Sequence, residues 1–249
     1  MNLLTRTRAL PRLTALALAL CASSTAFAGP GDTVYRPIVE KGETEFEFRA
    51  GYADFGHGEG ESAYLFAIGY GVNDRWKTEI GFEHESENGF NGKLTVVEWE
   101  NVFVLTEQGK HWMDVGLFLE YEHTFAEGPD ELKIGPMFEK QVGSTIANLN
   151  LVFEHEIGSG ASSDTDLDYT WQVKWQGRPE LEWGLQGFGG LGHVNDLGGE
   201  DEHSLGPALF GVKRLASGNK VSYDAAVLAG VNSAAPDLTV RLKLEYEMY

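Results

Sequence analysis

Residues 63–84 alternate between apolar and small or charged positions in two runs, which a polar turn joins. In the first run Tyr64 and Phe66 share one parity, and alanines and glycines fill the other. In the second run Ile80 and Phe82 fall on the apolar parity, and Glu79 and Glu83 fall on the other. Because side chains along a β-strand point alternately to opposite faces, each run predicts a strand with one apolar face. The polar turn at residues 73–75 makes the pair a hairpin.

The same alternation recurs along the chain and predicts about twelve strands between residues 43 and 249. Strands of about ten residues suit a tilted crossing of a bilayer, and an even number returns both termini to the periplasmic side. The expected connections alternate between short turns, as at residues 143–144, and longer polar loops, as at residues 55–61 and 192–203. The fold class expected is all-β: a closed transmembrane antiparallel up-and-down barrel of the bacterial outer-membrane type. The alternative is a soluble sandwich or lipocalin-like barrel, which would turn its apolar faces inward and close with fewer strands.

The N-terminus predicts export. Residues 1–28 combine three arginines, a short apolar run and an Ala-Phe-Ala cleavage site, as a secretory signal peptide does. The apolar run is too short to span a bilayer as a helix. Residues 29–42 contain Pro30 and Pro37 and are expected to form a periplasmic segment before the barrel at residues 43–249.

The charge of the chain narrows its partners. The whole sequence has a formal net charge of −19, and without residues 1–28 it has 16 basic against 38 acidic residues, or −22. Nucleic acid is therefore excluded as a partner, because binding to phosphates requires a basic surface. The partners expected are outer-membrane lipid and a small-molecule solute, and the sequence leaves the oligomeric state open.

If the apolar faces meet lipid, the alternate positions line a lumen that is mostly acidic. The acidic residues predicted at the lumen or its mouth are Glu79, Glu83, Glu98, Glu100, Glu120, Glu122, Glu154 and Glu156. The basic residues predicted there are Arg49, Lys174, Arg241 and Lys243. Carboxylate rings favour cations in pores, whereas the simpler interpretation is that these acids hydrate the interior and pair with the lumen bases.

Larger apolar side chains also fall on the inward parity. Phe118, Met137, Phe188 and Phe210 are expected to narrow the lumen or to contact an apolar solute.

Three Glu-His pairs recur near the outer ends of predicted strands and give weak candidate metal ligands at His84, His123 and His155. These histidines share the parity of the lipid-facing residues, so an interfacial role is preferred over metal binding. No catalytic set is found, no enzymatic activity is expected and no cofactor is implied.

The final aromatic residue does not share the parity of the apolar residues in the last predicted strand. Outer-membrane barrels end on an aromatic residue, and Tyr249 is aromatic, but the apolar residues of its strand are even-numbered. Either Tyr249 overhangs the barrel, or a bulge near Glu247 shifts the phase.

The segment Gly-Tyr-Gly-Val-Asn-Asp-Arg-Trp at residues 69–76 resembles a hairpin of the family described as the MetA pathway of phenol degradation, a family of outer-membrane transporter barrels. Val72 and Asn73 depart from the Leu and Thr of that hairpin. The resemblance implies uptake of small, often aromatic or hydrophobic compounds, and it supplies no catalytic residues.

These patterns together predict an outer-membrane channel or transporter for passive passage of small solutes through an acidic lumen. The solutes expected are cationic or neutral, with hydrophobic and aromatic compounds among them. Two alternatives stay open: a plugged barrel with a structural or surface-binding role, and a metal-binding resistance protein.

Overall fold

The computed structural model describes residues 29–87, 94–125, 128–198 and 201–249, so the predicted signal peptide lies outside the described residues. The strands follow one another along the chain as β1 (Thr44–Gly56), β2 (Glu59–Asn73), β3 (Trp76–Glu87), β4 (Val96–Val104), β5 (Asp114–Thr124), β6 (Asp130–Val142), β7 (Thr145–Ile157), β8 (Thr165–Arg178), β9 (Leu181–His193), β10 (Asp196–Leu197), β11 (His203–Arg214), β12 (Lys220–Gly230) and β13 (Leu238–Met248). Within these residues no helix is long and apolar enough to cross a membrane.

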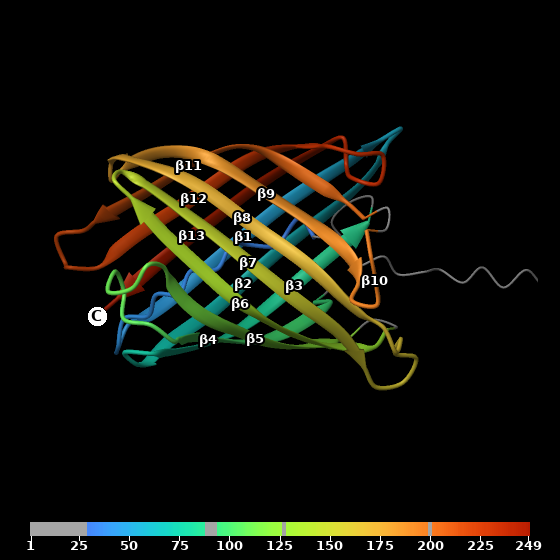
Figure 1. The fold of residues 1–249 in the computed structure, drawn as a ribbon, viewed down its shortest axis with the longest axis horizontal. Coiled ribbons are helices and arrows are strands. Elements are labelled where there is room, and N and C mark those ends of the chain that lie inside the picture. Colours follow the sequence, from blue (N-terminus) through green and yellow to red (C-terminus); the bar gives the residue numbers. More distant parts are fainter. Residues whose placement is uncertain (1–28, 88–93, 126–127, 199–200) are drawn as a thin grey trace, which may run out of the picture.

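The strands close into a barrel (Figure 1). Each long strand pairs antiparallel with the next long strand, and β13 returns to pair with β1. The short β10 pairs only with the end of β9, and β11 takes the next place in the wall, so twelve strands form the ring. The predicted twelve-stranded antiparallel barrel is thus confirmed.

The two faces of the wall differ as the alternation predicts. Large apolar side chains on the outer face are exposed, such as Phe66 at 61% and Ile68 at 54%. Charged side chains at the alternate positions are buried inside, such as Glu79 at 1% and Glu120 at 3%. This is the reverse of a soluble domain, in which apolar faces pack inward.

The two ends of the barrel carry different connections. At the turn end, where β13 finishes, residues 74–75, 143–144 and 179–180 form two-residue turns. At the opposite end, the loop end, longer connections occur at residues 158–164 and 194–202.

Two predicted connections differ from the structure. The loop expected at residues 55–61 shrinks to a turn at residues 57–58, because Gly56, His57 and Gly58 all adopt positive φ and allow a tight reversal. The connection at residues 105–113 is longer than a periplasmic turn is expected to be, although it lies at the turn end.

The largest difference concerns residues 29–42, which we call the strap. The strap was expected in the periplasm, but it runs inside the barrel. Figure 1 shows it, in blue, passing lengthwise through the barrel to the end where the C-terminus lies. A Cβ at Gly51 would overlap the carbonyl oxygen of Pro30, and one at Gly71 would overlap that of Glu40. These inward glycines let the strap backbone approach the wall closely.

Tyr249 overhangs the end of the barrel, which is the first of the two explanations given above for its position outside the apolar parity of the last strand. β13 ends at Met248, and its pairings with β1 and β12 continue without a register shift. The hydroxyl of Tyr249 donates a hydrogen bond of 2.8 Å to Glu43, and its ring lies 4.9 Å from the Lys220 ammonium. The last residue therefore turns toward the interior rather than toward lipid.

Candidate functional site: an acidic lumen closed by a strap

A cavity of about 830 Å³ opens inside the barrel at the loop end, and we call it the loop-end cavity. Among the described residues that line it, thirteen carry carboxylates, against one arginine, one lysine and two histidines. The acidic lining residues are Asp32, Glu61, Glu83, Glu85, Glu98, Glu120, Glu122, Glu131, Glu154, Glu156, Asp164, Asp166 and Asp168. A low-dielectric wall with one sign of charge raises the local concentration of counter-ions.

The structure brings six of the eight predicted acids to this cavity: Glu83, Glu98, Glu120, Glu122, Glu154 and Glu156. The other two, Glu79 and Glu100, are buried further along the lumen. The inward placement of this set is therefore as predicted from parity, while its role in selectivity is left to the proposal below.

Arg49 lies at the inner limit of the cavity and is itself buried. Its Nη2 donates to Glu100 at 3.0 Å and lies 3.7 Å from Glu79, and its Nη1 lies 3.9 Å from Glu98. Nε forms a further ion pair with Glu47. One guanidinium thus faces four carboxylates, which leaves the surrounding lumen negative.

Lys133 is the second base of the cavity, and it was not among the predicted lumen bases. Its Nζ pairs with Glu122 and lies 3.4 Å from Glu120 and 3.8 Å from Glu131. Its parity in β6, opposite Leu132 and Ile134, already indicated an inward side chain.

The strap is fastened to the wall by polar contacts. Tyr35 exchanges two backbone hydrogen bonds with the Asn150 side chain, at 2.8 and 3.0 Å, and its hydroxyl donates to Glu100 at 3.0 Å. Arg36 forms a two-point ion pair with Glu139, at 2.7 and 2.9 Å. Charge-assisted, two-point pairs of this kind fix orientation as well as distance.

The four apolar residues predicted at a constriction are buried inside the barrel, and the strap packs against them. Phe118 and Met137 form one buried cluster, against which Tyr35 stacks at 4.0 Å from the Phe118 ring. Phe188 and Phe210 belong to a second buried cluster, which includes Val34 of the strap.

The two clusters lie on opposite walls. Phe118 is on β5, while the second cluster includes Leu228 on β12, six places away in a ring of twelve. Successive side chains of an extended segment point in opposite directions. Val34 and Tyr35 therefore contact opposite walls, and the strap fills the lumen at this level.

The remaining predicted bases also face inward, and two of them, Lys174 and Lys243, form ion pairs. Lys174 lies 3.2 Å from Glu182, and Lys243 lies 2.7 Å from Glu245. Arg241 places its guanidinium 3.8 Å from the Phe188 ring and donates to the carbonyl of Gly29 at 3.5 Å.

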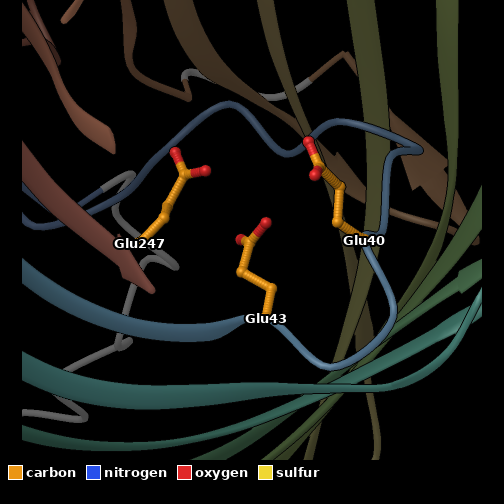
Figure 2. Close-up of side chains that lie close together, drawn as sticks. All are labelled: Glu40, Glu43 and Glu247. Atoms are coloured by element: carbon orange, nitrogen blue, oxygen red, sulfur yellow. The ribbon is translucent and has the colours of Figure 1, made fainter. Parts of the chain in front are cut away.

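At the turn end three carboxylates converge around Lys220, and we call these four residues the latch. Figure 2 shows the side chains of Glu40, Glu43 and Glu247 gathered at this end, one from the strap and the others next to β1 and on β13. Lys220 donates to Glu40 at 2.8 Å and to Glu247 at 2.6 Å, and it lies 3.9 Å from Glu43. Partial burial raises the pKa of Glu40, but the hydrogen bonds from Lys220 and Tyr249 and the charges of Lys220 and Arg214 together outweigh burial and leave that pKa below its usual value.

The candidate metal ligands do not come together. His123 pairs with Asp130 at 2.8 Å, His155 contacts the Asp164 carbonyl at 3.0 Å, and His84 is buried beside Tyr64. In the described residues, three carboxylate groups are compact enough for a metal, and none contains a histidine.

Each of these carboxylate groups already contacts a basic side chain. They are Glu40, Glu43 and Glu247; Glu45, Glu47 and Glu79; and Glu98, Glu100 and Glu120. The bases are Lys220 for the first, Lys77 and Arg49 for the second, and Arg49 and Lys133 for the third. Basic side chains of the protein therefore already neutralise part of the charge of each group.

Glu202, in the connection between β10 and β11, was not predicted as a site residue. It is 6% exposed, and its Oε1 has no hydrogen-bond partner in the described part of the chain. Burial raises the pKa of Glu202 to about 8, and the carboxylates of Glu61 and Asp32 add to the rise. Its position in a glycine-rich loop gave no parity from which burial could be read.

Comparisons with known proteins agree with the barrel. No family model and no curated protein matches the chain. The COG4313 outer membrane channel from Pseudomonas putida F1 is similar in structure, with a TM-score of 0.57 at 13% identity, covering 88% of this chain and 98% of that one. The NanC porin is similar with a TM-score of 0.55 at 10% identity, covering 82% and 99%. At these identities the likeness establishes a shared outer-membrane barrel fold.

Proposed function

We propose that this protein is a bacterial outer-membrane channel for passive passage of small cationic or neutral solutes. The observation that carries the proposal is the loop-end cavity, where thirteen carboxylates face the inside of a closed barrel. Carboxylates that line a pore favour cations and exclude anions. Two similar structures, a channel and a porin, support passage as the task of this fold.

The strap sets the size limit in this proposal. Val34 and Tyr35 reach opposite walls at the constriction, so passage of a solute requires the strap to shift. The cavity above this level collects the solute, and displacement of the strap admits it to the turn end.

We also propose membership of the phenol-degradation MetA family, on the hairpin at residues 69–76. Hydrophobic or aromatic solutes would then contact the apolar clusters around Phe118 and Phe188. The proposal includes export with cleavage of residues 1–28 and contact with outer-membrane lipid through the apolar outer face.

A plugged barrel with a structural or surface-binding role is the second candidate. The observation in its favour is the strap itself, which Tyr35 and Arg36 anchor to the wall through Asn150, Glu100 and Glu139. A strap that never moves leaves the cavity as a surface pocket rather than a passage.

Single-channel recording in a planar bilayer under a salt gradient separates the two candidates. The channel proposal expects discrete current steps with a reversal potential of the cation-selective sign. The test uses the full mature protein, and insertion is verified by protease protection of the barrel. A sealed bilayer with verified insertion would overturn the channel and leave the plugged barrel.

A further inference from the structure

The direction of the strap places its first described residue at the loop end. Gly29 lines the loop-end cavity, whereas Glu40 reaches the latch at the turn end. The predicted cleavage site lies between Ala28 and Gly29. Cleavage there creates a new α-amino group at a position inside the acidic cavity.

Gly29 is held in place by its own turn. Its carbonyl accepts a hydrogen bond from the Asp32 amide at 3.1 Å and one from Arg241 at 3.5 Å. The neighbouring Pro30 packs against the backbone of Gly51, where a Cβ would overlap its carbonyl oxygen. The contacts of the Gly29 carbonyl and of Pro30 therefore fix the position of the Gly29 nitrogen.

Two carboxylates of β3 stand next to this end of the strap. A Cβ built on Gly29 would lie 3.9 Å from Glu85 Oε1, and one on Gly31 would lie 2.5 Å from Glu83 Oε1. In the described part of the chain, neither carboxylate lies within 4.0 Å of a basic side chain. Lys133 acts on both carboxylates only from a greater distance, because its ammonium pairs directly with Glu122.

The cavity also contains an unsatisfied acceptor. Glu98 lines it and is 3% exposed, yet its Oε1 accepts no hydrogen bond from any described residue. The hydroxyl of Ser62, 7% exposed and also in the lining, has no partner within the same residues. A buried acceptor without a donor is costly, which favours a cationic donor in the cavity.

We propose that the α-ammonium group of the mature chain, at Gly29, binds in the loop-end cavity as a tethered ligand of Glu83 and Glu85. The site is then one for primary ammonium groups, and the N-terminus is its resident occupant. Small organic amines compete for the same carboxylates. This proposal depends on cleavage before Gly29, and it holds whether or not the barrel conducts.

The test is the pKa of the α-amino group in the folded mature protein. Reductive methylation with ¹³C-labelled formaldehyde gives an N-terminal resonance that can be titrated by NMR. An ordinary α-amino pKa is about 7.7–8.0, and a carboxylate within about 4–6 Å raises the pKa of a cation by about 1–3. We expect a pKa of about 9 or higher in the unmodified sequence and a fall toward the ordinary value in Glu83→Gln/Glu85→Gln.

The control variant is Glu107→Gln/Glu180→Gln, which removes the same charge from exposed positions at the turn end. It should leave the α-amino pKa raised. An ordinary pKa in the unmodified protein would overturn the proposal, as would an equal fall in both variants. A mature mass that does not begin at Gly29 would overturn it as well.

Discussion

Glycines at inward positions decide where the strap can lie. Gly51, Gly71 and Gly116 face strap atoms at distances that no Cβ would allow, and all three have ordinary strand backbone angles. These glycines leave room for the strap because they have no side chain. A larger residue at these positions should therefore leave the strand intact and displace the strap.

Gly51→Val tests this directly. The new side chain would overlap the backbone of Pro30, so the strap must retreat from β1 or the fold must absorb a cost of about 1–3 kcal/mol from overpacking. We expect larger single-channel conductance and faster proteolysis within residues 29–36. Gly177→Ala, on β8 with nothing within 4 Å of its Cβ position, is the matched control. Unchanged conductance and proteolysis in Gly51→Val would show that the strap does not limit passage.

The single residue Glu202 makes the stability of the fold depend on pH. Because burial raises its pKa to about 8, the folded state binds its proton more tightly than the unfolded state, and the charged form destabilises the fold as pH rises from about 4.5 to 8. We therefore expect Glu202→Gln to melt several degrees higher than the unmodified protein at pH 9 and at the same temperature at pH 5. Differential scanning calorimetry in detergent gives both values. A pH-independent difference would mean that the carboxylate is not buried as described.

Parity predicted the residues of the wall well, because a strand forces each side chain to one of two faces. It placed all eight acids and the four apolar constriction residues inside. It could not reveal that Tyr35 stacks on Phe118, because no periodicity relates the strap to β5. The one available signal was the apolar residues of the strap, Val34, Tyr35 and Val39, which are unusual in a segment expected to lie in water.

The strap contains local turns but no helix or strand, so its position depends on contacts with the wall and on anchors at both ends. At the loop end a turn and Arg241 hold it, and at the turn end the latch does. The latch also joins the first and last strands, since Glu43 precedes β1 and Glu247 is on β13.

Lys220→Met should loosen the strap at the turn end. Removal of the ammonium leaves Glu40, Glu43 and Glu247 facing one another without a counter-charge, and a hydrogen bond to a charged group contributes about 1.5–3 kcal/mol. We expect amide exchange in residues 38–43 to accelerate by about tenfold or more, measured by mass spectrometry. Lys213→Met, whose side chain is exposed on β11, is the control. Equal exchange in both variants would show that the latch does not hold the strap.

The elements were predicted to different degrees. The central strands were found because lipid outside and charge inside impose a strict alternation. The ends of β1 and β2 were missed because the turn depends on positive φ at Gly56, His57 and Gly58, which alternation does not report. The short β10 was also missed, since two residues carry no periodicity.

Negative charge is distributed unevenly along the length of the barrel. Thirteen carboxylates line the cavity at the loop end, while the constriction and latch pair most of their acids with Arg36, Lys220 and Lys243. An ion that enters from the loop end therefore meets the larger excess of negative charge first. Selectivity should depend on that end.

Removal of three cavity charges should lower cation selectivity. In Glu83→Gln/Glu154→Gln/Asp168→Asn we expect the cation-to-anion permeability ratio to move toward one, because fewer fixed charges attract counter-ions. The reversal potential under a salt gradient measures this ratio. Asp74→Asn/Glu107→Gln/Glu180→Gln removes the same charge from exposed positions at the turn end and should change the potential less. The opposite ranking would place the selective region at the turn end.

The path of the strap has a consequence for how the barrel is assembled. Gly29 lies at the loop end, while the strap leads directly into β1, whose partner β13 closes the wall. With a leader at residues 1–28, as the sequence predicts, a chain still attached to the inner membrane could not carry Gly29 through a finished barrel. We therefore expect removal of that leader before the β1–β13 seam closes, and we expect a bulky protein fused before Gly29 to stall assembly rather than appear on the cell surface.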